Sequence, residues 1–280
     1  MQLEDEMSQL AFERSGTGAP LVLLHGIGMS GRVWDPVVPA LSAQFEVIAI
    51  DLPGHGRSAP FPDDVEPLPA TMAVSVAKLL DDLGIIDPYV VGNSLGGWVA
   101  LELARIRSVA SLMLLSPAGL WRDSAPRYAQ LSLRASSWLA RHAGGLLAQL
   151  VNYRLGRLLV LGQTHGRPTR LTAEQARATI LTLATSSGFD ATLSATANQR
   201  YRGGPAIDAP VTVAFGSRDL VLLARQARHL DRLPSQTRVA ELPGCGHVPM
   251  SDDPTAVIDL IRSAIPFEAP GEGHLAGASG

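Results

Sequence analysis

Six short apolar runs, each followed by turn-forming residues, constrain the fold of this 280-residue chain more than any other feature. The run at residues 21–24 ends in His-Gly-Ile-Gly, and the run at 45–50 ends in Asp-Leu-Pro-Gly. Apolar segments of this length that stop at glycine or proline are typical of buried β-strands. The predicted strands are residues 21–24, 45–50, 89–92, 110–115, 211–215 and 237–242.

Segments with a helical spacing of apolar residues separate these strands. The predicted helices are residues 33–41, 70–83, 95–105, 222–233 and 254–265. Strands that are apolar on both faces and alternate with helices indicate a mainly parallel sheet that is covered by helices on both sides. The fold class is therefore predicted to be α/β.

The alternation breaks once, between about residues 120 and 201. Helical patterns at 127–142, 146–161 and 172–184 follow one another there without a convincing strand. This predicts an all-helical insertion, or cap, between the fourth and fifth predicted strands. Residues 121–202 hold eleven arginines and three acidic residues. We interpret these arginines as residues of solvent-exposed helix faces. The alternative is that they bind an anionic substrate or surface.

Composition narrows the possible partners and cofactors. The formal net charge of −3 gives no reason to expect a nucleic-acid partner. Cys245 is the single cysteine, which excludes an internal disulfide and a cysteine-rich zinc site, and we interpret it as a small apolar filler. The sequence has no glycine-rich phosphate-binding loop, so no cofactor is predicted. His142, His165, His229 and His274 lack metal-ligand spacing and are predicted to be surface residues.

The two ends of the chain bear on its location. The N-terminal residues are acidic where a signal peptide needs a basic stretch, and no apolar run approaches the length of a membrane span. We therefore expect a cytoplasmic protein with no membrane span. Residues 266–280 contain few large apolar side chains and are predicted to be a disordered tail. The oligomeric state stays open.

The run Gly92-Asn93-Ser94-Leu95-Gly96 lies between a predicted strand and a predicted helix. Glycines that flank a serine in this context allow a tight turn with the serine at its apex. A simple glycine-rich turn with Ser94 as a helix cap is the alternative. If Ser94 is a nucleophile, a histidine must act as its base and a carboxylate must orient that histidine.

Two downstream loops supply these groups. Asp219 follows the predicted strand 211–215, and His247 follows the predicted strand 237–242. Both positions lie at strand ends on the same edge of a parallel sheet as Ser94, in the chain order Ser, Asp, His. Asp219 could instead cap a helix, His247 could be a loop residue bonded to backbone, and Asp123 could replace Asp219. The sequence thus predicts a serine nucleophile with its base and orienting acid.

These motifs resemble those of the α/β-hydrolases that carry a lid, and the resemblance covers about residues 10–265. It implies an eight-stranded, mostly parallel sheet with the all-helical cap inserted after strand 6. The hydrolase core would comprise 1–119 and 203–265, and the lid 120–202. The two N-terminal strands of the family would lie near residues 10–14 and in the residues before them.

By the same resemblance, Ser94 is the nucleophile, His247 the general base and acid, and Asp219 the carboxylate that fixes the imidazole tautomer. The backbone amides of Ile27, in His25-Gly26-Ile27-Gly28, and of Leu95 would form the oxyanion hole. His55, in Pro-Gly-His-Gly-Arg-Ser, belongs to a loop that the family also has, and we interpret it as structural.

A serine at the elbow favours acyl transfer over the chemistry of family members that carry aspartate there. We expect hydrolysis of a carboxylic ester with a small or medium apolar acyl group. The alternatives are a carbon–carbon bond hydrolase of the meta-cleavage type and a ligand-binding protein without activity. Trp121, Trp138 and Tyr153 are predicted to line the substrate pocket, or else to form the core of the lid.

Overall fold

A seven-stranded sheet is the centre of the computed structural model, which describes residues 10–203 and 207–265. The strands run in the order β1-β3-β2-β4-β5-β6-β7. Strand β1 pairs antiparallel with β3, and every other pair in the sheet is parallel. The strands are β1 (Phe12–Ser15), β2 (Ala19–Leu24), β3 (Phe45–Ile50), β4 (Tyr89–Asn93), β5 (Ser111–Leu115), β6 (Val211–Gly216) and β7 (Arg238–Leu242).

All six strands predicted from the apolar runs are confirmed to within two residues at each end. Strand β1 corresponds to the strand expected near residues 10–14. The other N-terminal strand was expected in residues that lie outside the described part of the chain. The described part therefore contains seven strands, not eight, and in it the helical insertion follows the fifth strand, β5. The predicted tail, 266–280, also lies outside the described residues.

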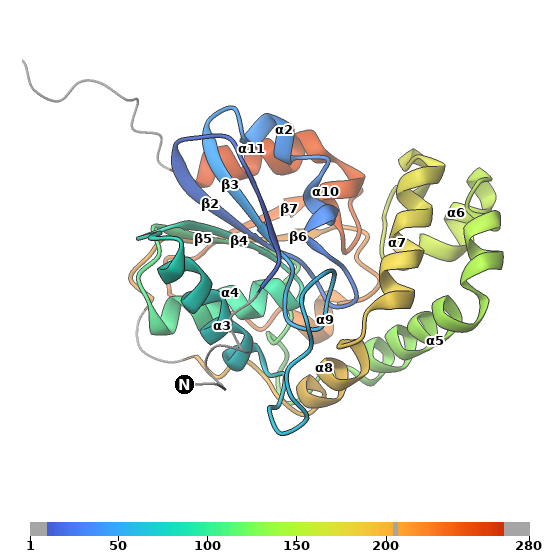
Figure 1. Cartoon of the computed structure of the whole chain (residues 1–280), viewed down its shortest axis with the longest axis horizontal. Helices are drawn as coiled ribbons and strands as arrows, with labels where there is room; N and C mark the ends of the chain where they lie inside the picture. Colours follow the sequence, from blue (N-terminus) through green and yellow to red (C-terminus); the bar gives the residue numbers. More distant parts are fainter. Residues whose placement is uncertain (1–9, 204–206, 266–280) are drawn as a thin grey trace, which may run out of the picture.

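Helices cover both faces of the sheet (Figure 1). Val22 and Leu24 of β2 pack into one apolar cluster with side chains of α3 and α4, whereas Leu21 and Leu23 pack into another with side chains of α2 and α11. Alternate residues of one strand are thus buried on opposite faces, as a parallel sheet requires. The helices of these layers are η1 (Gly31–Trp34), α2 (Val38–Leu41), α3 (Pro69–Asp82), α4 (Leu95–Ile106), α9 (Ala224–Ala227), α10 (Pro249–Asp252) and α11 (Pro254–Ala264).

Two of the predicted helices in these layers differ from the structure. The segment 33–41 forms η1 and α2 as two short pieces. Pro36 has no N–H group to donate to the carbonyl of Arg32, which accepts the amide of Asp35 instead, so a regular α-helix cannot run through this position. The helix predicted at 222–233 is wrong, since only the single turn α9 forms there. The Asp219 carboxylate accepts the amides of Val221 and Leu222, which fixes a turn where that helix was expected to begin.

Four helices between β5 and β6 lie to one side of the sheet in Figure 1. They are α5 (Arg127–Leu150), α6 (Arg154–Leu161), α7 (Ala173–Thr185) and α8 (Phe189–Thr196), with the short η2 (Pro168–Arg170) before α7. We call this stretch, 127–196, the helical segment. It has a small apolar core of its own, which includes Leu147, Val151 and Ile180. The helical patterns predicted at 127–142 and 172–184 are confirmed. The helix predicted at 146–161 is interrupted at residues 151–153, between the end of α5 and the start of α6, and α8 was not predicted. In the part of the chain that the structure describes, no helix is long and apolar enough to cross a bilayer.

Glycines allow α4 to lie against β2 and β4 at backbone contact. A Cβ atom at Gly96 would lie 2.3 Å from the carbonyl oxygen of Leu24, and one at Gly92 would lie 2.3 Å from the carbonyl oxygen of Gly96. Since these neighbours are backbone atoms, no side-chain rotation could relieve the overlap. The turn between β4 and α4 therefore requires glycine at both positions.

We expect Gly96→Ala to lower the free energy of unfolding by roughly 3 kcal/mol or to prevent folding, because the added methyl group overpacks against backbone. Urea unfolding followed by circular dichroism measures the change. The control is Gly145→Ala in α5, where an added Cβ meets nothing within 4 Å; it should gain about 0.5–1 kcal/mol from the lower backbone entropy of alanine. Equal stabilities of the two variants would contradict the packing argument.

Candidate active site

Ser94 lies at the apex of the turn between β4 and α4. Its backbone has φ 54° and ψ −114°, a left-handed conformation that is uncommon for a residue with a side chain. The turn is held by its amide, which donates to the carbonyl of Leu115 at 3.0 Å, and by its carbonyl, which accepts the amides of Gly97 and Ala118. Backbone strain that neighbouring bonds maintain is found at functional sites. The sequence context predicted this geometry.

His247 and Asp219 form a buried hydrogen-bonded pair. The Nδ1–H group of His247 donates to Oδ2 of Asp219 at 2.9 Å, and Oδ1 of Asp219 accepts the amides of Val221 and Leu222, each at 2.9 Å. Both carboxylate oxygens are therefore occupied and the carboxylate cannot rotate freely. With Nδ1 as the donor, Nε2 of the neutral imidazole is left as a hydrogen-bond acceptor.

The electrostatics of Asp219 keep it ionised. Burial would by itself raise the pKa of this carboxyl group, but the positive charge that His247 carries when protonated, together with the hydrogen bonds from His247 and the Leu222 amide, outweighs burial and lowers the pKa below its ordinary value. An ionised Asp219 is the form that can stabilise a proton on the imidazole. Asp123, the alternative acid, is exposed and pairs with Arg200.

Asn93 ties the serine turn to the histidine loop and was not singled out in the sequence. Its Nδ2 group donates to the carbonyl of Leu115 at 3.0 Å and to the carbonyl of His247 at 2.9 Å. One buried amide thus links β4, β5 and the loop that carries His247. Its position directly before Ser94 could have drawn attention to Asn93. The sequence could not show its bond to His247, which lies 154 residues away along the chain.

The loop after β2 lies beside Ser94. A Cβ atom at Gly26 would be 3.2 Å from the Cβ of Ser94, a tight contact, so the loop approaches the serine closely. Ile27 and Ser94 line the same cavity. Leu95 is the first residue of α4, and amides in the first helical turn lack an intrahelical acceptor. The two residues predicted for the oxyanion hole therefore belong to two separate segments that both lie beside the serine.

Two buried histidines support this loop. The Nδ1–H group of His25 donates to the carbonyl of Gly26 at 2.7 Å, and its Nε2 accepts the amide of Leu52 at 2.9 Å. Burial lowers the pKa of His25, which keeps it neutral, as an acceptor nitrogen must be. His55 donates to the carbonyl of Pro53, and burial together with the neighbouring His25 lowers its pKa to about 3. These contacts agree with the structural interpretation of His55.

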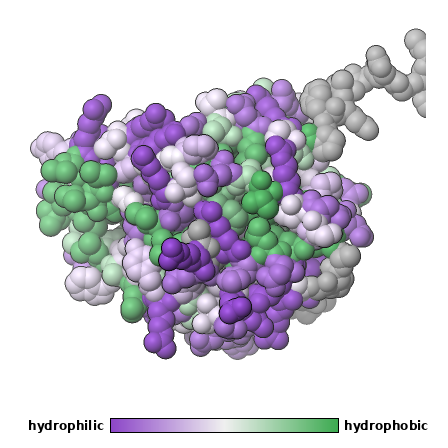
Figure 2. Space-filling view, turned by 180° about the vertical axis from the view of Figure 1, so that it is seen from behind, coloured by the Kyte–Doolittle hydropathy of each residue, from purple (hydrophilic) through white to green (hydrophobic). Residues whose placement is uncertain are grey.

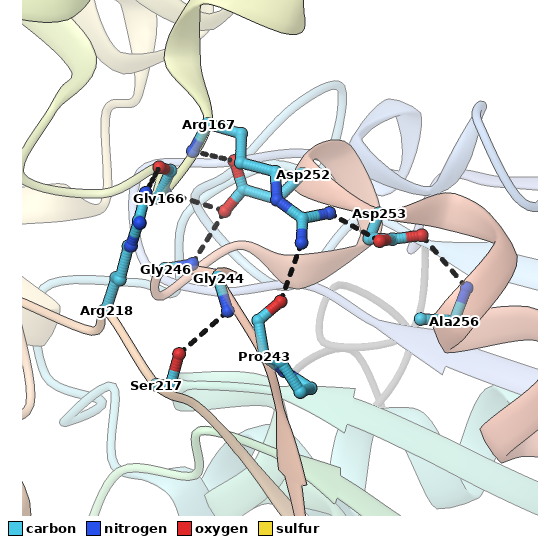
Figure 3. Close-up of polar contacts among 10 residues, drawn as sticks. All are labelled: Gly166, Arg167, Ser217, Arg218, Pro243, Gly244, Gly246, Asp252, Asp253 and Ala256. Carbon is cyan, nitrogen blue, oxygen red and sulfur yellow. Dashed lines mark hydrogen bonds and ion pairs between the residues drawn. The ribbon is translucent and has the colours of Figure 1, made fainter.

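A carboxylate in α10 fastens the histidine loop to the helical segment (Figure 3). Oδ2 of Asp252 accepts the amides of Gly246, at 2.7 Å, and Gly166, at 2.8 Å, while Oδ1 accepts the amide of Arg167 at 2.8 Å. The guanidinium of Arg167 in turn pairs with Asp253 and donates to the carbonyl of Pro243. The residue before His247 is therefore bonded to the same carboxylate as the loop between α6 and η2.

His165 lies in this connection and is buried, so its prediction as a surface residue is wrong. The reason is backbone contact between the two loops: a Cβ at Gly246 would lie 2.5 Å from the Gly166 nitrogen. Burial lowers the pKa of His165. Cys245 is buried in the same region, where burial and the charge of Asp252 raise its pKa to about 11, which fits an inert filler.

A cavity of about 340 Å³ joins Ser94 and His247. Its far wall comes from α5, α6, α7 and α8 of the helical segment and is mostly apolar. The apolar side chains include Leu139, Leu147, Leu159, Ile180, Leu183 and Phe189. A neighbouring cavity of about 410 Å³ lies between η1 and α7 and contains neither Ser94 nor His247 in its lining. The smaller cavity is therefore the candidate site, because Ser94 and His247 both line it.

The three aromatic residues predicted to line the pocket lie elsewhere. Trp121 is buried edge-on against Trp98 and donates its Nε1–H to the carbonyl of Gln199. Trp138 stacks on His142 and is 61% exposed, and Tyr153 is 72% exposed. None of the three belongs to the cavity lining. Helical periodicity could not show which apolar side chains of these helices would line the cavity.

The chain matches known proteins over most of its length. The profile described as "Alpha/beta hydrolase family" matches residues 21–260. Uncharacterized protein Rv2715 of Mycobacterium tuberculosis is 30% identical over 281 residues, which cover 94% of this chain and 80% of that protein. The pimeloyl-[acyl-carrier protein] methyl ester esterase of Photobacterium profundum is 26% identical over 273 residues, 91% of this chain and 98% of that protein.

Among solved structures, a thermophilic esterase from Thermogutta terrifontis superposes with a TM-score of 0.72. The two sequences are 26% identical, and the alignment covers 91% of this chain and 92% of the esterase.

We expect Asp252→Asn to lower the free energy of unfolding by about 2 kcal/mol, because an amide nitrogen would replace one of the oxygens that accept backbone N–H groups. Urea unfolding measures the loss. The matched control is Asp259→Asn, an exposed position on α11, where a change within about 0.5 kcal/mol is expected. Indistinguishable midpoints would show that the Asp252 contacts do not hold the two loops together.

Proposed function

Because the chain belongs to the alpha/beta hydrolase family, we propose that it hydrolyses carboxylic esters with a small or medium apolar acyl group. Ser94 is the nucleophile, His247 the general base and acid, and Asp219 the orienting carboxylate. The observation that carries the proposal is one cavity lined by both the strained Ser94 and His247, whose ring is hydrogen-bonded to the buried Asp219.

The reaction proceeds in two acyl transfers. Ser94 Oγ bonds to the ester carbonyl carbon as its proton passes to Nε2 of His247, and the carbonyl π electrons move to oxygen. Collapse of this tetrahedral intermediate breaks the bond to the alcohol oxygen, which takes the proton from Nε2. Water then attacks the acyl-enzyme and gives a proton to Nε2. The second collapse releases the carboxylic acid and returns that proton to Ser94.

Charge develops on the former carbonyl oxygen in both tetrahedral intermediates. We propose the amides of Ile27 and Leu95 as its hydrogen-bond donors. The support is their position on the loop beside Ser94 and at the first turn of α4. Preorganised donors in a site closed to water stabilise such a charge more than donors in solution.

The acyl group would lie against the apolar wall of the cavity. A cavity of about 340 Å³ is at the small end of the range for ligand sites, which favours a small or medium acyl chain. We also propose that residues 120–202 act as the lid of the site, since their helices supply that wall. The named relatives, an esterase for pimeloyl-[acyl-carrier protein] methyl ester and a thermophilic esterase, support ester chemistry.

We expect wild-type protein to hydrolyse aryl esters of increasing acyl length with an optimum at short or medium chains, and Ser94→Ala to lose this turnover. Wild type should also be labelled covalently by a serine-directed phosphonate, and Ser94→Ala should not. Initial rates and intact-protein mass spectrometry measure both. Labelling that persists in Ser94→Ala would reject the nucleophile, and labelling without ester turnover would favour carbon–carbon bond hydrolysis.

We expect Asp219→Asn to reduce kcat by a factor on the order of 10⁴, because the variant no longer fixes the tautomer of His247 or stabilises its protonated form. Asp123→Asn, at the exposed alternative acid, should retain wild-type kcat. Steady-state kinetics on the best ester of the series measures both variants. A large loss of kcat in Asp123→Asn with little loss in Asp219→Asn would assign the role of orienting carboxylate to Asp123 instead.

A further inference from the structure

Helix α6 presents its apolar side to solvent. Leu155 is 65% exposed and Leu159 is 76% exposed, and Leu158 is exposed on the same face. The inner face carries Gly156, the buried Leu161 and the buried Arg157, whose Nη1 donates to the carbonyls of Val151 and Asn152. A helix on the surface of a water-soluble domain normally has the opposite arrangement. Helix α6 therefore needs a partner for its outer face.

The outward apolar face extends over the corner between α5 and α6. It consists of Leu146, Leu150, Tyr153, Leu155, Leu158 and Leu159, all exposed, and we call it the α5–α6 apolar face. In the space-filling view, hydrophobic side chains gather at the end of the molecule where these helices lie (Figure 2). Contiguous exposed apolar surface of this kind marks an interaction site.

The charge around this face indicates which partner it fits. Residues 124–173 contain seven arginines and not one aspartate or glutamate, although Arg141 and Arg167 pair with Asp190 and Asp253 from outside this stretch. Arg154, at the start of α6, and Arg170, in η2, are both exposed. A second copy of the chain would bring two such basic segments together, and like charges oppose that contact. An anionic surface with an apolar interior satisfies both the arginines and the leucines.

We propose that the α5–α6 apolar face docks on an anionic lipid bilayer. The leucines enter the boundary between headgroups and acyl chains, and Arg154 and Arg170 remain among the lipid phosphates. Tyr153 suits this boundary, because tyrosine has an apolar ring and a polar hydroxyl group. Each arginine near an anionic leaflet contributes about a fivefold gain in partitioning.

The docking face is continuous with the cavity. Leu159 is mostly exposed on α6 and also lines the cavity that contains Ser94, and Leu139 of α5 is exposed and lines it too. An amphiphilic ester in the bilayer would therefore meet the same leucines that form the cavity wall. This link to the substrate rests on the proposed function, whereas the docking itself does not.

The test is co-flotation of the whole chain with two kinds of vesicle: phosphatidylcholine alone, and equal parts of phosphatidylcholine and phosphatidylglycerol. We expect at least about tenfold stronger partitioning onto the anionic vesicles, falling as salt rises. The double variant Leu155→Gln/Leu158→Gln should bind about tenfold more weakly. Ile86→Gln, at an exposed isoleucine between α3 and β4, is the matched control and should bind like wild type.

Three outcomes would overturn the proposal: no binding to anionic vesicles, equal loss with Ile86→Gln, or a dimer in sedimentation velocity that Leu155→Gln/Leu158→Gln converts to monomer. The last result would assign the face to a second copy. Thermal unfolding of each variant shows whether it is folded. Ser94→Ala should bind vesicles like wild type, so that failure of docking and failure of the esterase proposal are separate results.

Discussion

Backbone contact between α4 and the two central strands is the constraint on which the site depends. Gly96 lets the first turn of α4 lie on the carbonyl of Leu24, and Gly92 leaves room for that turn above β4. The strained backbone at Ser94 follows from this contact, because the chain must reverse within one residue. The same contact brings the end of β2 beside the serine, so that Gly26 and Ile27 lie next to its side chain. A larger residue at either glycine would separate these elements and with them the serine from its proposed oxyanion hole.

Three polar side chains hold the loop that carries His247. Asn93 holds the carbonyl of His247 from the sheet side, and Asp252 holds the amide of Gly246 from the side of the helical segment. Asp219 then fixes the ring itself. These three side chains are buried, and an unpaired buried polar group is costly, so the bonds specify one position of the loop. Since Asp252 also holds Gly166 and Arg167, the helical segment and the proposed base share one anchor.

The helical segment combines two unlike surfaces. Its inner side supplies the leucines of the cavity, and its outer side exposes further leucines among arginines. The exposed Arg154 and Arg170 give this side positive charge, while the chain as a whole is slightly negative. A small apolar core of its own, around Leu147 and Ile180, allows the segment to keep this shape without covering its outer face.

The sequence by itself determined the elements whose signal is local. Apolar runs that end at glycine or proline predicted six strands, and the glycines around Ser94 predicted the tight turn, because strand length and turn sterics depend on neighbouring residues. The positions of Ser94, Asp219 and His247 directly after predicted strands also indicated that they lie at the same edge of the sheet, since parallel strands end at one edge. Only the tertiary structure decided what depends on distant contacts. It paired Asn93 with His247, and it buried His165 through the contact between Gly166 and Gly246. It also formed a turn after Asp219 near the predicted start of a helix, and it left Trp138 and Tyr153 exposed and outside the cavity lining. Periodicity shows that a helix has an apolar face, but only packing determines which neighbour, if any, covers it.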